Sequence, residues 1–196
     1  MALEDIRDTK IEKVKKLRKA GVDPYPAVSG QTSCIHDALG KFEELAGSKE
    51  KLVLTGRILA RREHGGSVFF DINDGTEKIQ AYIKEDVIGS DSFENFNKFV
   101  DIGDFIAIEG HLFKTKKDEK TIAAASYKLL AKAFLPLPEK WEGLQDVEER
   151  FRKRYLDLLM NPEVKDKFIK RSRIIQSIRD YLLKHKFVEV TTPTLQ

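Results

Sequence analysis

The stretch Ser67–Ile83, SVFFDINDGTEKIQAYI, predicts a β-hairpin, and this hairpin decides the fold. Apolar and polar residues alternate on both sides of Asp74-Gly75, a pair that is typical of a tight turn. The apolar members are Val68, Phe70 and Ile72 before the turn and Ile79, Ala81 and Ile83 after it. We therefore expect one face of the hairpin to be buried in a core.

Phe69 departs from this alternation. Because successive side chains of a strand point to opposite faces, Phe69 falls on the polar face, where we expect its ring to contact water. A turn symmetric about Asp74-Gly75 predicts that Phe69 lies directly opposite Gln80. An aromatic ring beside a primary amide can stack on a nucleobase and hydrogen-bond to its edge. The alternative is an exposed ring packed under a neighbouring loop, and the hairpin pattern alone does not separate the two.

Composition indicates an ordinary globular protein. The 196 residues, of which 41% are hydrophobic, suffice for one domain with a full core and part of another. The single cysteine, Cys34, excludes an internal disulfide and a cysteine metal cluster, which indicates a reducing, cytoplasmic compartment. No apolar run approaches about 18 residues, and the start does not resemble a signal peptide. We expect neither secretion nor a membrane partner.

The formal net charge of +3 is concentrated in the first twenty residues. Residues 2–20 predict a helix that ends at Gly21, with acidic residues early and basic residues late, as the helix dipole favours. This order favours a structural helix, and a basic helix lying against a phosphate backbone is the alternative. Its apolar stripe is thin and predicts loose docking; it consists of Ile6, Val14 and Leu17.

The region around the hairpin predicts a small barrel. Residues 27–51 read as a connection with a short helical patch at 36–45, and a helix is expected at 91–100. Strands are expected at 52–60, on both sides of the hairpin turn, at 105–112 and at 121–130, with a charged tip at 114–120. Five strands with a helix between the third and fourth are typical of an OB-fold, which often binds single-stranded nucleic acid on strands two and three. Phe69 lies on that face, which favours its role in base stacking.

The C-terminal part has a different character. Residues 134–138 predict a stiff linker and 143–159 a charged helical run, after which Asn161-Pro162 is expected to cap a second helix. An apolar stripe runs along that helix, made of Val164, Phe168, Ile175, Ile178 and Leu182, and a strand-like FVEV follows at 187–190. The fold class is thus mainly β with helices (α+β). The expected parts are 1–50 (helix and connection), 51–133 (OB-fold), 134–146 (linker) and 147–196 (the incomplete start of a second domain).

The order of these parts resembles the class II aminoacyl-tRNA synthetases of the aspartate, asparagine and lysine subgroup. FVEVTTPTL at 187–195 is similar to the end of motif 1, with Pro193 as the motif proline, and RYLDL at 154–158 precedes it in the same order. Within the subgroup the chain resembles the N-terminal part of bacterial-type lysyl-tRNA synthetases. The stretches that carry this likeness are GVDPYP at 21–26, GHLFKTK at 110–116, and LPLP at 135–138 leading to GLQD at 143–146.

The resemblance implies that the barrel binds the tRNA(Lys) anticodon. It implies that Phe69 stacks on the central uridine, that Gln80 and Arg62 hydrogen-bond to its edge, and that Glu119 contacts a flanking base. The resemblance is the only ground for Arg62 and Glu119, because Arg62 lies past the predicted strand, where the alternation assigns no face.

The resemblance also implies a lysine–tRNA ligase that uses ATP and Mg²⁺ to activate lysine and transfers it to tRNA. Motifs 2 and 3 lie beyond motif 1, so this sequence offers no catalytic residue and no metal ligand, and alone it is expected to bind tRNA without catalysis. Motif 1 implies a homodimer, formed through the helix from Pro162 with Phe168, Ile175 and Pro193.

Two other readings remain open at this point. One is a fragment of an aspartyl- or asparaginyl-tRNA synthetase, and the other is a free-standing OB-fold module that binds nucleic acid. The sequence does not reveal whether Gln196 is a natural end, although the incomplete motif 1 unit favours a truncated enzyme.

Overall fold

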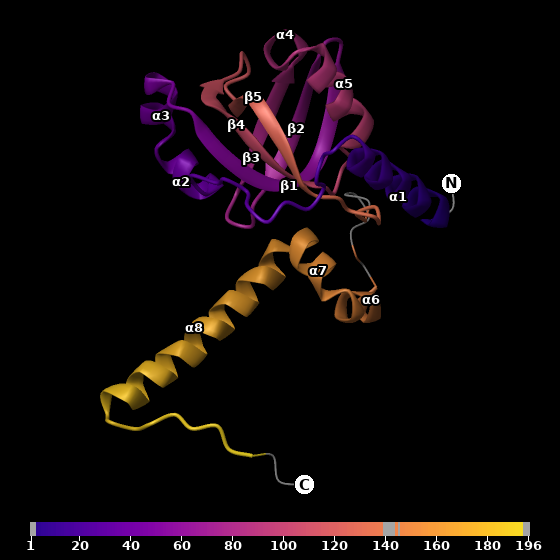
Figure 1. Cartoon of the computed structure of the whole chain (residues 1–196). Helices are drawn as coiled ribbons and strands as arrows, with labels where there is room; N and C mark the ends of the chain where they lie inside the picture. The colour runs from indigo at the N-terminus through magenta and orange to yellow at the C-terminus, as the bar shows by residue number, and fades with distance from the viewer. Residues whose placement is uncertain (1–2, 139–143, 145, 194–196) are drawn as a thin grey trace. The chain divides into compact units, whose positions relative to one another are not determined.

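The computed structural model describes residues 3–138, 144 and 146–193, which form two compact units that divide between Pro136 and Leu137 (Figure 1). The helices of the first unit are α1 (Leu3–Lys19), α2 (Ile35–Gly40), α3 (Phe42–Ser48), α4 (Glu85–Ile88) and α5 (Ser90–Phe99). Its strands are β1 (Leu52–His64), β2 (Ser67–Asn73), β3 (Lys78–Lys84), β4 (Phe105–Lys114) and β5 (Lys120–Ala131).

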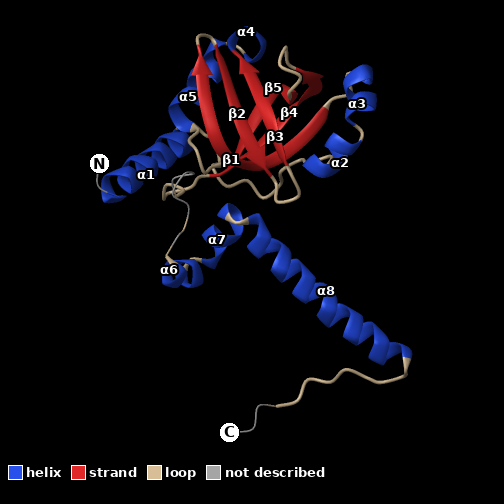
Figure 2. Cartoon of the chain, turned by 180° about the vertical axis from the view of Figure 1, so that it is seen from behind, coloured by secondary structure: helices blue, strands red, loops and turns tan. Residues whose placement is uncertain are grey.

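The five strands close into a barrel in the order β1-β2-β3-β5-β4, with β3 and β5 parallel and every other pair antiparallel (Figure 2). Helix α5 lies between β3 and β4 in the chain, as expected. This confirms the predicted OB-fold and the α+β class.

The barrel interior is filled by the residues that the alternation predicts. Fully buried side chains come from all five strands: Leu54, Ile58, Val68, Phe70, Ile72, Ile79, Ile83, Ile106, Ile108, Leu112 and Ile122. Helix α5 adds Phe93 and Phe96 to this core, where the ring centroids of Phe96 and Phe70 lie 5.2 Å apart.

The interpretation of residues 27–51 as a connection is wrong. Helices α2 and α3 bury Ile35, Ala38 and Phe42 in the same core as the strands. The helical patch predicted at 36–45 is confirmed, but as two helices of six and seven residues, which span about two turns each and are too short for a helical period to show which side chains are buried.

Helix α1 docks on the barrel through charge as well as apolar contact. Val14 and Leu17 are buried as its stripe predicts, but Lys10 is buried beside them. The Nζ atom of Lys13 lies 2.7 Å from Asp101 Oδ1, and burial lowers the pKa of Lys10. The docking is thus more extensive than the apolar stripe suggests and favours the structural reading of this helix.

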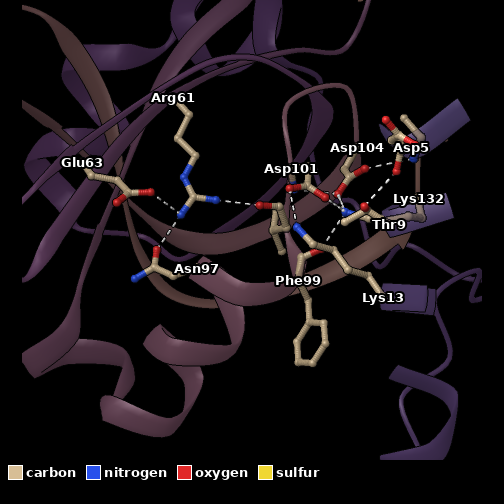
Figure 3. A network of polar contacts seen from close by, with 12 residues as sticks. Asp5, Thr9, Lys13, Arg61, Glu63, Asn97, Phe99, Asp101, Asp104 and Lys132 are labelled. Atoms are coloured by element: carbon tan, nitrogen blue, oxygen red, sulfur yellow. Dashed lines mark hydrogen bonds and ion pairs between the residues drawn. The ribbon is translucent and has the colours of Figure 1, made fainter. Parts of the chain in front are cut away.

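Asp101 belongs to an ionic network centred on Lys132, at the end of β5 (Figure 3). The ammonium of Lys132 is fully buried and donates to Asp104 Oδ2 and to the Phe99 carbonyl, both at 2.6 Å, and to Asp101. Burial raises the pKa of Asp101, but hydrogen bonds from Lys13 and Lys132 outweigh this effect and hold it below its usual value. The network joins α1, the end of α5 and β5.

The second unit begins with α6 (Val147–Arg152), α7 (Arg154–Met160) and α8 (Pro162–Lys184). The fully buried carboxylate of Asp157 links these helices. It accepts hydrogen bonds from Arg150 Nε at 2.7 Å, from Arg154, and from Asn161 Nδ2 at 2.7 Å. As predicted, Asn161 is the N-cap residue of α8 and Pro162 its first residue, but the Asn161 side chain bonds Asp157 and makes no capping hydrogen bond to α8.

The apolar stripe of α8 is largely exposed, as expected. Phe168, Ile175, Ile178 and Leu182 are 40–55% exposed, whereas Val164 is buried. The strand predicted at 187–190 is wrong, because these residues pair with no strand in the described part of the chain. The expectations for Gly143 and for residues 194–196 fall outside the described residues.

Candidate nucleic-acid interface

The hairpin of β2 and β3 has a different register from the one predicted. Phe69 pairs with Tyr82, and Gln80 pairs with Asp71, so the prediction that Phe69 lies directly opposite Gln80 is wrong. The shift is two residues, which preserves the face of every side chain. Gln80 is therefore a diagonal neighbour of Phe69 on the same outer face.

The shift arises because the turn contains four residues, between the pair Asn73 and Lys78. The Asn73 side chain accepts from the Gly75 N–H at 2.7 Å, and Gly75 adopts a φ of 91°. Asp74 Oδ1 accepts from the Thr76 N–H, the Thr76 hydroxyl and the Glu77 N–H, and its Oδ2 accepts from Ile35 N–H of α2 at 2.7 Å.

The Asp74 carboxylate therefore stabilises the turn through these hydrogen bonds. Burial raises its pKa, but the hydrogen bonds from Ile35, Thr76 and Glu77 outweigh burial and leave the pKa below its usual value. The side chain anchors the hairpin tip to α2 as well as to its own loop.

Arg62 lies in one row of paired residues across the sheet, together with Phe69 and Tyr82. Strand β1 continues to His64, beyond the end predicted at Ala60, and its register shifts between Ile58 and Ala60. After this irregularity Arg62 pairs with Phe69, which in turn pairs with Tyr82. The exposed guanidinium of Arg62 thus belongs to the same outer face as Phe69, a placement that the alternation of the sequence did not assign.

Phe69 and Tyr82 form a tilted ring pair with centroids 4.6 Å apart. Phe69 is half-buried by this contact, so its ring is less exposed to water than the alternation predicts. Tyr82, which lies beside Phe69, is not among the site residues predicted from the sequence. The signal was present, because Tyr82 shares the alternation of Lys78 and Gln80 and hence their face.

Gln80 and Glu119 are brought together although they lie 39 residues apart. The Gln80 Nε2 atom donates to Glu119 Oε2 at 3.0 Å, and its Oε1 accepts from the Thr121 hydroxyl at 3.0 Å. Gln80 is buried, whereas Glu119 is exposed in the tip between β4 and β5. An amide held on both sides in this way presents its remaining N–H in a defined direction, which suits recognition of a base edge.

The tip that carries Glu119 is rich in lysine. The tip KTKKDEK at 114–120 carries four lysines, all of them exposed. Lys114 is held by Glu43, at 2.9 Å between Nζ and Oε1, and this hydrogen bond raises its pKa. Exposed cations beside an aromatic platform are typical of proteins that follow a nucleic-acid backbone.

The described residues contain no group of three His, Cys, Asp or Glu side chains that could hold a metal ion. Within the same residues, no helix has the length and apolar character needed to cross a membrane.

Comparison with known families gives two matches. Residues 52–130 match the model of the OB-fold nucleic acid binding domain, and residues 146–196 match that of the class II tRNA synthetases (D, K and N). The first range covers β1 to β5, and the second covers the three helices of the second unit.

Similar proteins agree with this division. A lysine–tRNA ligase of Carboxydothermus hydrogenoformans is 44% identical over 98% of this chain, one of Pelotomaculum thermopropionicum is 43% identical over 99%, and one of Thermotoga maritima is 38% identical over 98%. The chain spans 38–39% of the length of these three relatives. Their names favour the lysyl subgroup over the two alternative readings. Residues 52–130 are thus an OB-fold nucleic acid binding domain and residues 146–196 part of a class II tRNA synthetase (D, K and N) domain, in a chain that is similar to lysine–tRNA ligases over nearly its whole length.

Proposed function

We propose that the outer face of β1, β2 and β3 binds the anticodon of tRNA(Lys). Phe69 stacks on the central uridine, and Gln80 and Arg62 hydrogen-bond to the edge of that base. Glu119 contacts a flanking base from the tip between β4 and β5. The observation that carries the proposal is the placement of a half-exposed ring, a cation and an oriented amide on neighbouring positions of one OB-fold face.

The Gln80–Glu119 contact suggests how flanking bases are read. In the free protein one N–H of the Gln80 amide is satisfied by the Glu119 carboxylate. A base that approaches Gln80 meets this carboxylate next to it, so Glu119 favours bases that present a hydrogen-bond donor at that point. The pair thus links recognition of the central base to recognition of its neighbour.

The test is a titration of a fluorescent anticodon stem-loop at fixed salt, because the affinity of nucleic-acid complexes depends strongly on ionic strength. Phe69→Ala is expected to weaken binding by about 1–3 kcal/mol, the usual value of one stacked base. Phe105→Ala is the matched control, since Phe105 is 42% exposed at the opposite end of β4 from the tip. Equal affinity of Phe69→Ala and wild type would refute the proposed platform.

In the whole protein this face would serve a lysine–tRNA ligase, which activates lysine with ATP and Mg²⁺ and acts in the cytoplasm. The described residues show no cluster that could hold Mg²⁺, and we derive no catalytic step from them. The role proposed for this chain is to select tRNA(Lys). The division into 1–50, 51–133, 134–146 and 147–196 stays a prediction.

We propose further that α8 forms a homodimer interface, with Phe168, Ile175 and Pro193 in contact with a second copy. The exposed stripe of α8 supports this, because a contiguous apolar surface favours association. Sedimentation velocity is expected to show mass that rises with concentration, and Ile175→Glu is expected to shift the protein toward the monomer. Gln176→Glu, which adds the same charge away from the stripe, should retain association. A monomer at all concentrations would contradict the interface.

A further inference from the structure

Helix α3 packs beside β4 and contacts the tip that carries Glu119 (Figure 2). The Glu43 Oε1 atom lies 2.9 Å from the ammonium of Lys114, the last residue of β4. Phe42, the residue before Glu43, is buried in the barrel core. Two consecutive residues of α3 therefore lie where the tip leaves the barrel.

Phe42 contacts both ends of the tip. Lys114 and Lys120 pair directly across β4 and β5, and their ammonium groups lie 6.0 and 5.1 Å from the centre of the Phe42 ring. Like charges on directly opposite residues destabilise a sheet. The ring face of Phe42 attracts both cations, and Lys114 has carboxylates near it, that of Glu43 at 2.9 Å and that of Asp118 at 3.7 Å. These contacts offset the repulsion and fix the two ends of the tip against α3.

Hydrogen bonds within the tip carry this anchoring to Glu119. Thr115, the residue after Lys114, donates its N–H to the Glu119 carbonyl at 3.0 Å, and its hydroxyl accepts from the Glu119 N–H at 3.1 Å. The Glu119 carboxylate in turn accepts from Gln80 Nε2 at 3.0 Å. A continuous series of contacts thus joins α3 to the Gln80–Glu119 pair.

The ion pair between α3 and the tip adds little to folding stability. The side chains of Glu43 and Lys114 are 77% and 39% exposed, and ion pairs this exposed are weak because water screens them. Its effect is on geometry, because Lys114 and Thr115 are neighbours and Thr115 holds the backbone of Glu119. Loss of the ion pair should therefore change the direction of the tip without unfolding the barrel.

We propose that Glu43 and Phe42 are positioning residues, which hold the 114–120 tip so that the Glu119 carboxylate stays against Gln80 and selects the base next to the central uridine. The inference rests on the proposed anticodon function. It assigns part of that selection to α3, which lies outside the proposed binding face of β1, β2 and β3. Loss of the ion pair also frees the Lys114 ammonium for a backbone phosphate, so the expected signature is lower selectivity and not lower affinity.

The experiment measures selectivity for the bases that flank the central uridine. Wild type, Glu43→Gln, Glu119→Ala and the double variant are titrated at fixed salt with the anticodon stem-loop, and with stem-loops in which a flanking base is replaced by each of the other bases. The readout is the ratio of the affinities for the original and the replaced stem-loop, from which the general effect of a changed net charge cancels.

Glu44→Gln is the matched control. It makes the same change of charge on the next residue of α3, and Glu44 forms no ion pair with the tip in the part of the chain that the structure describes. Its ratio is expected to equal that of wild type.

Glu119→Ala is expected to lower the ratio at one flanking base by about 10-fold. Glu43→Gln should lower the ratio at the same base by about 3-fold to 10-fold, with a melting temperature near that of wild type. The double variant should match Glu119→Ala, because Glu43 acts through Glu119. Phe42→Leu, which keeps the apolar volume and removes the ring, should lower the ratio in the same direction, and a wild-type ratio for this variant would refute the role of the ring.

A wild-type ratio for Glu43→Gln together with a lowered ratio for Glu119→Ala would refute the positioning role and leave the proposed function intact. The same conclusion follows if Glu44→Gln lowers the ratio as much as Glu43→Gln, or if the effects of Glu43→Gln and Glu119→Ala add in full. A wild-type ratio for Glu119→Ala would refute both the positioning role and the contact of Glu119 with a flanking base. The Phe69→Ala titration then decides whether the rest of the anticodon function stands.

Discussion

Replacing Lys132 by methionine is expected to lower the free energy of unfolding of the first unit by about 3–5 kcal/mol. The methionine keeps the apolar stem but removes the ammonium that Asp101, Asp104 and the Phe99 carbonyl share. Asp104 is fully buried, and burial already raises its pKa although Lys132 favours its charged form. Without the ammonium this buried carboxylate loses the cation that lies 2.6 Å from its Oδ2 atom.

The measurement is urea unfolding followed by far-UV circular dichroism. Lys15→Met is the matched control, because its ion pair with Glu12 is exposed on the same helix that the network anchors, and we expect no measurable change. The double variant Lys132→Met with Asp104→Asn should recover part of the lost stability, since the amide is neutral and its single oxygen can still accept from one of the two backbone N–H groups, of Asp101 and Ala133, that donate to the two carboxylate oxygens. Wild-type stability of Lys132→Met would show that the network does not hold the unit together.

Gly110→Ala is expected to have the second largest effect, a loss of at least about 1–3 kcal/mol. A Cβ at Gly110 would lie 1.9 Å from the carbonyl oxygen of Ala123, a backbone atom of β5 that no side-chain rotation can move away. The register of β4 and β5 shifts at this point, between Glu109 and Gly110, so the close approach is part of how the two strands pair.

The same change should also weaken binding of the anticodon stem-loop, because Gly110 pairs with β5, the strand whose Thr121 holds the Gln80 amide. Thermal unfolding and the titration above measure the two effects. Gly47→Ala is the control, since a Cβ there meets nothing within 4 Å, and its melting temperature should stay near that of wild type. A Gly110→Ala protein with wild-type stability would mean that the strands separate at little cost.

Local patterns predict much of the barrel. Val68, Phe70 and Ile72 are buried because period-2 alternation is a property of the strand itself and does not depend on which strand lies beside it. For the same reason the alternation assigned Phe69 to the outer face correctly, although the predicted register was wrong by two residues.

The register could not be read from the turn residues alone. It depends on Asp74, whose carboxylate binds three groups of its own loop and also the backbone of Ile35. That last contact joins residues 39 positions apart, so the pattern of neighbouring residues does not predict it. The short α2 that supplies it overlaps the helical patch predicted at 36–45, but the sequence does not indicate its contact with the hairpin turn.

For the proposed site, the sequence by itself determined the face of Phe69 and Gln80, and family resemblance supplied Arg62 and Glu119. Only the tertiary structure decided which of these side chains are neighbours. The register shift in β1 places Arg62 beside Phe69, and the closure of β3 on β5 brings Gln80 to Thr121 and Glu119. The reason is physical: alternation is local to one strand, whereas pairing depends on loop hydrogen bonds, bulges and barrel closure, which join residues far apart in the chain.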